Sequence, residues 1–217
     1  FYCSAAVCSP SRAGLLTGRY HIRMGINTVF FPQSKDGLES SETSIARLLK
    51  ERGYATACIG KWHLGHLPEY LPTRHGFDAY FGLPYSNDMF VEKRGDPPLP
   101  LLRGETIIEQ PADQRTLTQR YTEEAVRFIG EHRHQPFFLY LAHNMPHVPL
   151  FVSDERYQED PHKSYKLAVE HIDASTGRIL QTLESCGIAR NTFIVYTSDN
   201  GPWLPKKHHA GCALPLR

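Results

Sequence analysis

The hydrophobic residues of the chain include three continuous runs, each of which ends in polar residues. The runs are Tyr54–Gly60, Pro136–Ala142 and Thr192–Ser198, and they lead into KWHLGH, HNMPH and DNG, respectively. A strand that faces water on one side alternates apolar and polar residues, whereas a continuous apolar run is typical of a strand covered on both faces. The three runs therefore predict buried strands of a parallel sheet.

Helical periodicity precedes each predicted strand. Apolar side chains three and four residues apart predict helices over Ser41–Gly53, Thr116–His132 and Ser164–Gly187. The stretches Gly65–Gly82 and Arg94–Gln114 are rich in proline and glycine and are expected to be irregular loops. Helices that alternate with strands are typical of layered α/β folds. We predict an α/β fold with a mostly parallel or mixed central sheet and helices on both of its faces.

Polar side chains at the predicted strand ends are the first candidates for a site. Open α/β sheets bind ligands at the carboxyl ends of their strands. Those ends carry Lys61, His63, His147, Asp199 and Asn200, so we expect these five side chains to converge. The 217 residues contain no linker that would divide them, which favours one domain.

Composition narrows the classes of function. Hydrophobic residues make up 41% of the chain and charged residues 22%, which is typical of a globular protein. The net charge of +1 gives no general attraction for nucleic acids or anionic membranes, so any anion binding is local. The longest apolar run is too short to span a bilayer. The five cysteines show neither a disulfide framework nor a zinc-finger spacing.

The segment CSPSRAGLLTGRY places a cysteine at the start of a predicted helix. Ser9 and Pro10 are typical of an N-cap and a first turn, and Gly18 of a helix end. Cys8 would then lie where free N–H groups favour negative charge, with Arg12 one turn further on the same side. This environment favours a nucleophilic thiolate over a buried structural cysteine. A thiolate phosphatase fits poorly, because its motif normally has a longer spacing to the arginine, with glycines between.

Several motifs together resemble the type I sulfatases of the alkaline phosphatase superfamily. CSPSR, followed by LTGR, resembles the first signature of that family, and GYATACIGKWHLG resembles the second. TSDNG is similar to its metal-binding strand end, and GFDAYFGLPYSND to the branch of arylsulfatase A and N-acetylgalactosamine-6-sulfatase. The resemblance keeps order and spacing over essentially the whole chain.

The resemblance implies that residues 1–217 are part of a sulfatase catalytic domain and that the protein hydrolyses sulfate esters, with sulfated small molecules or glycans as substrates. It implies that a formylglycine-generating enzyme oxidises Cys8 to Cα-formylglycine. In the hydrated aldehyde one hydroxyl attacks sulfur, and the second allows sulfate to leave by elimination. Two alternatives stay open: a phosphonate or phosphate monoester hydrolase of the same superfamily, and an inactive, truncated or carbohydrate-binding relative.

The resemblance also assigns roles to individual side chains. Arg12 would stabilise anionic oxygens, and Lys61 would bind a sulfate oxygen. His63 would orient or deprotonate the formylglycine hydroxyl. His147 would protonate the leaving oxygen, and Ser86 would contact the sulfate.

A divalent cation, Ca²⁺ or Mg²⁺, is implied as the cofactor. Its ligands would be the group made from Cys8, together with Asp199 and Asn200, whose oxygens suit hard cations. Without the resemblance, DNG would be interpreted as an Asx turn. One carboxylate and one amide do not complete such a site, and the resemblance implies that an adjacent Asp pair on a strand before Phe1 supplies the other metal ligands. The resemblance also implies a second lysine of the active site after Arg217. The chain is thus expected to be a fragment that lacks the first strand and the C-terminal part.

The remaining histidines and basic residues carry weaker expectations. His66 and His75 are expected to be solvated loop residues, and PKKHHAG an exposed loop near the site. The chain contains no N-glycosylation sequon. Members of the family are exported, so we expect a periplasmic or secreted protein, or a lysosomal one in a eukaryote. Neither a nucleic-acid partner nor a membrane span is expected.

Overall fold

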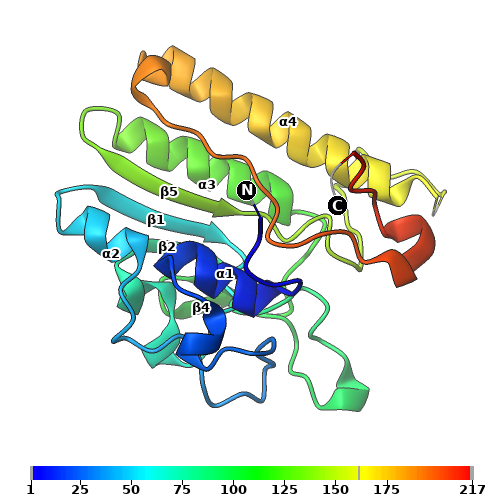
Figure 1. Ribbon diagram of the computed structural model, residues 1–217. Helices are drawn as coiled ribbons and strands as arrows, with labels where there is room; N and C mark the ends of the chain where they lie inside the picture. Colours follow the sequence, from blue (N-terminus) through cyan, green and yellow to red (C-terminus); the bar gives the residue numbers. More distant parts are fainter. Residues whose placement is uncertain (1, 161, 216–217) are drawn as a thin grey trace.

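A mixed sheet forms the centre of the protein (Figure 1). The computed structural model describes residues 2–160 and 162–215. In this part of the chain the strand order is β4-β3-β2-β1-β5, in which β1 runs parallel to β2 and β5, and β3 is antiparallel to β2 and β4. The strands are β1 (Ala55–Gly60), β2 (Ala79–Gly82), β3 (Leu101–Arg103), β4 (Thr106–Glu109) and β5 (Phe137–Ala142).

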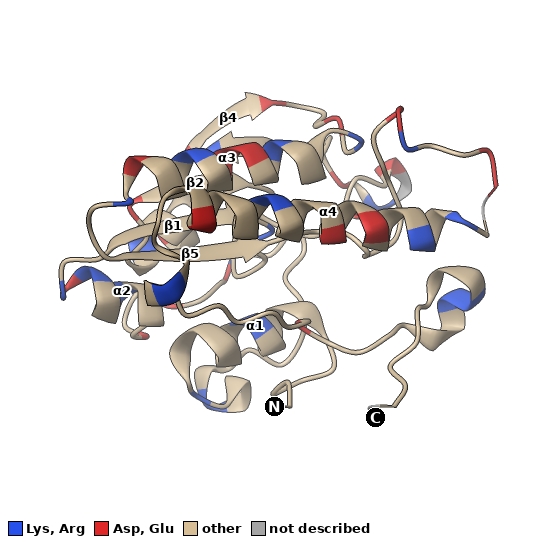
Figure 2. Cartoon of the chain, turned by 90° about the horizontal axis from the view of Figure 1, so that it is seen from above, with Lys and Arg blue, Asp and Glu red and all other residues tan. Residues whose placement is uncertain are grey.

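Helices cover both faces of the sheet, as predicted (Figures 1 and 2). On one face lie α1 (Cys8–Thr17) and α2 (Ile45–Lys50). On the other lies α3 (Leu117–Glu131), against which α4 (Ser164–Ser185) packs. Short 3₁₀ helices occur in the connections: η1 (His21–Met24), η2 (Pro68–Tyr70), η3 (Pro72–His75), η4 (Glu92–Arg94), η5 (Ala189–Asn191) and η6 (Leu204–His209). None of the helices in the described part of the chain combines the length and apolar character needed to cross a membrane.

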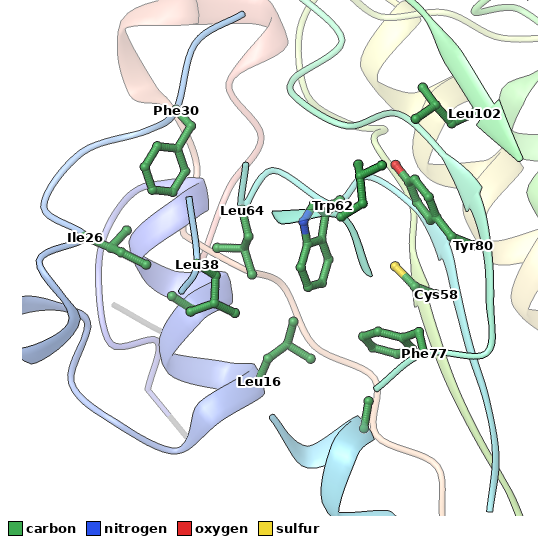
Figure 3. Packing of buried hydrophobic residues seen from close by; sticks show 13 residues of the cluster. Leu16, Ile26, Phe30, Leu38, Cys58, Trp62, Leu64, Phe77, Tyr80 and Leu102 are labelled. Atoms are coloured by element: carbon green, nitrogen blue, oxygen red, sulfur yellow. The ribbon is translucent and has the colours of Figure 1, made fainter. Parts of the chain in front are cut away.

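The side chains of β1 show why its apolar run is continuous. Cys58 points to the face of α1 and α2, where it packs in one cluster with Leu16, Trp62 and Phe77 (Figure 3). Ile59 points to the face of α3 and belongs to a second cluster. Because both faces are covered, every position of the strand is better apolar than polar. The predicted strands at 54–60 and 136–142 are confirmed as β1 and β5.

The prediction of a third strand at Thr192–Ser198 is wrong, because the described structure has no strand there. This segment is irregular and pairs with no described strand (orange in Figure 1). Its apolar side chains face solvent, with Phe193 91% and Val195 66% exposed. An apolar run predicts burial, but a strand also needs a hydrogen-bonded neighbour, and the described structure places none beside this segment.

Short strands occur in both stretches that were expected to be loops. Strand β2 lies within Gly65–Gly82, and β3 and β4 lie within Arg94–Gln114. These strands have only three or four residues each, which is too short for a recognisable pattern. The two long predicted helices are confirmed within two residues at each end, as α3 and α4. Helix α2 is shorter than the predicted Ser41–Gly53. It begins after Ser44, whose side chain caps it by accepting a hydrogen bond from the Arg47 N–H at 3.0 Å.

Candidate active site

Helix α1 presents Cys8 at its first residue. The N-cap is Val7 in an extended conformation, so the prediction that Ser9 caps the helix is wrong. Ser9 lies inside the first turn, where its Oγ accepts a hydrogen bond from the Phe30 N–H at 3.2 Å. Gly18 ends the helix in a left-handed conformation, as predicted. Cys8 is therefore buried at the positive end of the helix dipole.

Side chains from the ends of β1 and β2 converge on this thiol. Lys61, directly after β1, places its Nζ 3.3 Å from the Cys8 Sγ and donates a hydrogen bond to the Ser86 Oγ at 3.1 Å. Lys61 and Ser86 are each only 1% exposed. Burial lowers the pKa of the Lys61 ammonium group, because the charged form loses its hydration.

Arg12 joins the helix to the segment after residue 198. Its Nε and Nη2 donate to the Asp199 Oδ2 at 3.0 and 2.9 Å, and its Nη1 donates to the Lys61 carbonyl oxygen at 2.5 Å. The Ser11 hydroxyl donates to the Asp199 carbonyl oxygen. Burial opposes the charged forms of both Arg12 and Asp199. The charges of Arg12 and Lys61 nevertheless hold the pKa of Asp199 below its usual value. The pKa of Arg12 is raised by its interactions with Tyr140 and Asp199.

His147, in the loop after β5, completes the group around Cys8. Its Nδ1 lies 2.6 Å from the Val148 carbonyl oxygen and donates to it, which leaves Nε2 for the site. Burial opposes ionisation of the thiol, but the hydrogen-bonding interaction with His147 and the charges of Lys61 and Arg12 outweigh burial. Together they lower the pKa of Cys8 to about 7.

His63 is held with a free acceptor nitrogen. Its backbone has a positive φ of 60°, which is strained for a residue with a side chain and is characteristic of functional sites. The Nε2 donates to the Phe30 carbonyl oxygen at 2.9 Å, and the buried Nδ1 has no partner in the described structure. Burial, followed by the charges of Lys61 and Arg12, lowers the pKa of His63 well below its ordinary value. The imidazole is therefore neutral, and its free Nδ1 can accept a hydrogen bond.

Asp199 and Asn200 present two oxygens that suit a hard divalent cation. The Asn200 Oδ1 is buried and has no partner, which marks an unmet requirement for a donor or a cation. Among the described residues, however, no group of three His, Cys, Asp or Glu side chains is arranged to hold a metal ion. Asp199 and Asn200 therefore fit part of a ligand set for a hard cation and do not complete one by themselves.

Sequence reasoning missed residues that position the site. The Asn87 Nδ2 donates to the Pro149 carbonyl oxygen at 3.2 Å and to the Gln114 Oε1 at 3.1 Å, which fixes the loop that carries His147. The Tyr140 hydroxyl lies 3.4 Å from the Arg12 Nη1. Asn87 follows Ser86 in PYSND, so it neighbours a residue that the resemblance had assigned to the site, whereas Tyr140 looked like an ordinary strand residue.

The two expected loop histidines behave differently. His75 is completely buried and packs against the Trp62 ring at 5.6 Å, so the expectation of a solvated residue is wrong. Its ring fills core volume between η3 and the Trp62 side chain. His66 is partly exposed, with its ring 5.9 Å from that of Tyr85.

Comparison with known proteins gives consistent matches over nearly the whole chain. A model of the Sulfatase family matches residues 1–213. Arylsulfatase G of Mus musculus is 38% identical over 245 residues, covering 100% of this chain and 46% of the relative. N-acetylgalactosamine-6-sulfatase of Mus musculus is 41% identical over 223 residues, and the match covers 94% of this chain and 43% of the relative. The chain thus spans about half the length of the curated relatives it matches.

A solved structure resembles the fold. The crystal structure of Ps i-CgsB in complex with k-i-k-neocarrahexaose superposes with a TM-score of 0.78 at 30% sequence identity. The match covers 92% of this chain and 49% of that one.

Proposed function

This chain belongs to the sulfatase family, and from that premise we propose that the complete protein hydrolyses sulfate esters after oxidation of Cys8 to Cα-formylglycine. The observation that carries the proposal is the convergence of Lys61, Ser86 and His147, from three strand ends, on the residue at the start of α1. Formylglycine, as its hydrate, supplies an oxygen nucleophile and a second hydroxyl through which sulfate is released.

The charges of the site favour a sulfate group. Arg12 and Lys61 are buried cations, and the N–H groups at the start of α1 add positive potential at the same place. Such preorganised groups stabilise the negative charge that develops on sulfate oxygens in the transition state. Ser86 offers a neutral hydrogen bond beside Lys61.

Two histidines act on the exchangeable protons of the reaction. The His63 Nδ1, unprotonated and without a partner, is suited to accept a hydrogen bond from the nucleophilic hydroxyl and so to orient it. The His147 imidazole, which is oriented by the Val148 carbonyl oxygen, is suited to donate a proton to the leaving oxygen. The two roles fall to different rings, so one can accept while the other donates.

We propose Ca²⁺, or Mg²⁺, as the cofactor, with Asp199, Asn200 and the group made from Cys8 among its ligands. The cation would add positive charge next to the nucleophilic oxygen. The proposal includes an Asp pair before Phe1 as further metal ligands, because the described residues supply too few. It also includes a second lysine of the active site after Arg217. Residues 1–217 are accordingly proposed to be part of one catalytic domain.

Sulfated saccharides are the proposed substrates. Support comes from the name of the related N-acetylgalactosamine-6-sulfatase and from the oligosaccharide in the complex of Ps i-CgsB. We further propose that a formylglycine-generating enzyme modifies the protein, and that it works in the periplasm or outside the cell, or in the lysosome of a eukaryote.

A comparison of ester substrates tests the proposed reaction. The full-length protein, co-expressed with a formylglycine-generating enzyme, is assayed with 4-nitrophenyl sulfate, phosphate and a phosphonate monoester. We expect kcat/KM to be highest for the sulfate, and Cys8→Ala to abolish that activity. A preference for the phosphonate or phosphate would replace sulfate ester hydrolysis with the alternative activity of the superfamily.

A further inference from the structure

Trp203 and Lys206 form a surface patch directly beside His147. The ring centres of Trp203 and His147 lie 6.0 Å apart, with the rings inclined by 47°. The Lys206 Nζ lies 4.2 Å from the centre of the indole ring, within cation–π distance. The indole is therefore located between the histidine of the site and an ammonium group.

The patch is open to solvent and carries positive charge without a counter-ion. Trp203 is 48% exposed, and Lys206 and Lys207 are exposed side chains of η6. Among the ion pairs of the described residues, none involves Lys206 or Lys207. A half-exposed tryptophan next to unpaired cations is suited to a ligand that has both an apolar face and negative charge.

The backbone holds this arrangement in a strained turn. Lys207 and His63 are the two residues other than glycine that have a positive φ in the described structure, and Lys207 breaks the helical conformation inside η6 at φ 50° and ψ −111°. A side-chain-bearing residue in this region costs free energy, so such conformations concentrate at functional sites. Lys206 itself follows Trp203 by one turn, in which its backbone N–H donates to the Trp203 carbonyl oxygen at 2.9 Å, and its ammonium group lies over the indole.

The position of the sulfate ester fixes what lies against this patch. A sulfate held by Lys61 and Ser86 above Cys8 has its leaving oxygen next to His147, if His147 is the proton donor. The sugar that carries that oxygen then lies next to His147, whose ring is 6.0 Å from the exposed indole of Trp203.

Resting on the proposed function, we propose that Trp203 and Lys206 form a saccharide subsite for substrates with a second anionic group. The indole packs against the apolar face of the sugar ring, and Lys206 pairs with a further sulfate or carboxylate of the same oligosaccharide. The preferred substrate class is thus a polyanionic oligosaccharide rather than a simple aryl or monosaccharide sulfate.

Substrate-dependent kinetics of the full-length, modified enzyme test this subsite. The substrates are 4-nitrophenyl sulfate, a disulfated disaccharide, and a monosulfated disaccharide that contains a uronate. For Lys206→Ala we expect kcat/KM on the disaccharides to fall about fivefold more than on the aryl sulfate, as for an exposed ion pair. The difference should shrink in 0.5 M salt, since salt screens exposed charges. Whether the larger effect occurs with the sulfate or the uronate identifies the second anion.

Variants of Trp203 test the role of the indole, and a lysine away from the site provides a control. Trp203→Ala should lower kcat/KM on both disaccharides more than on the aryl sulfate, with Trp203→Phe intermediate. The control Lys50→Ala removes an exposed lysine at the carboxyl end of α2, where it pairs with Asp78 away from the site, and should change no substrate ratio. Equal losses on all three substrates, or no loss, would overturn the subsite.

A binding titration tests the proposed subsite independently of the proposed reaction. The Cys8→Ala enzyme is titrated with the disulfated disaccharide, with and without Lys206→Ala. We expect about fivefold weaker binding when Lys206 is replaced. If no sulfate ester is turned over but this difference persists, the proposed reaction fails and the subsite stands; if turnover is normal and the difference is absent, the subsite fails alone.

Discussion

At the scale of single residues, Arg12 and Lys61 place two buried cations around one carboxylate, that of Asp199. Asp199 pairs directly with Arg12, whereas the nearest partners of the Lys61 ammonium group are a thiol and a hydroxyl. A buried cation without a carboxylate in contact is unfavourable for the fold. The site therefore has a positive charge that an anionic group of the substrate would balance.

Replacement of Lys61 separates its effect on catalysis from its effect on stability. Lys61→Met should lower kcat/KM for a sulfate ester by about 100-fold or more, because a charged donor to the transition state is lost. The melting temperature should stay the same or rise, because the variant no longer buries an ammonium group. Steady-state kinetics and thermal melting check both effects, with Lys50→Met as the exposed control. A Lys61→Met enzyme with nearly unchanged kcat/KM would contradict the assigned role.

His75 makes stability depend on pH. Burial, followed by the charge of Arg47, lowers the pKa of His75 from 6.5 to about 4. Between pH 6.5 and 4 the His75 side chain binds a proton in the unfolded chain but not in the folded one. Protonation of the unfolded state therefore lowers the free energy of unfolding as the pH falls from 6.5 to 4, and has no effect above pH 6.5. The loss amounts to about 3 kcal/mol.

Unfolding titrations with urea check this effect. Between pH 7 and 4, the His75→Phe variant should lose less stability than the wild type, because one titrating group is gone. His134→Phe, at an exposed position, serves as the control and should behave like the wild type. Identical pH slopes for wild type and His75→Phe would show that His75 does not control acid stability.

At the scale of elements, the end of β1 depends on a glycine. Gly60 has φ of 107°, and a side chain there would overlap the carbonyl oxygen of Ala142 on β5. The next residue is Lys61, whose backbone N–H donates to that same carbonyl oxygen at 2.7 Å. The close contact of the two strands thus sets the position of the lysine in the site.

A pair of glycine substitutions tests this contact. Gly60→Ala should destabilise the protein by roughly 3 kcal/mol and reduce activity, because the strand end must move. Gly130→Ala lies in α3 with open space around it and should be neutral or stabilising by up to about 1 kcal/mol. Denaturant unfolding of both variants gives the comparison, and a fully stable, active Gly60→Ala enzyme would rule out the tight packing.

The same elements show what the sequence can and cannot predict. Strands β1 and β5 were predictable because apolar side chains on both of their faces pack against the core clusters, and α3 because one of its faces does. Strand β2 was not, since its four residues are held by neighbours distant in sequence. The strand ends indicated Lys61 and His147, and the structure places both side chains around Cys8. The contact of Trp203 with His147 depends on how two loops fold together, which no local pattern encodes.

At the scale of the whole molecule, one surface stands out as apolar. Residues 192–198 pair with no described strand and expose Phe193, Val195 and Tyr196 to solvent. Exposed apolar surface of this kind is typical of a contact with further protein. The matches cover 46% and 43% of the two relatives, so each relative has further sequence that this chain does not match.

Calcium binding should distinguish the full-length protein from residues 1–217. The full-length protein should melt at a higher temperature with Ca²⁺ than with a chelator, because a ligand that binds the native state stabilises it. Asp199→Asn should reduce this shift, whereas residues 1–217 alone should show little shift and no turnover. An equal calcium shift for residues 1–217 would mean that Asp199 and Asn200 need no further ligands.

The central claim is that the working group at position 8 is an aldehyde and not a thiol. Mass spectrometry of the peptide containing Cys8, from the full-length protein co-expressed with a formylglycine-generating enzyme, tests it together with sulfatase activity. We predict the mass of formylglycine in the active preparation and an unmodified thiol in an inactive preparation made without that enzyme. An active preparation in which Cys8 remains a thiol would contradict the account.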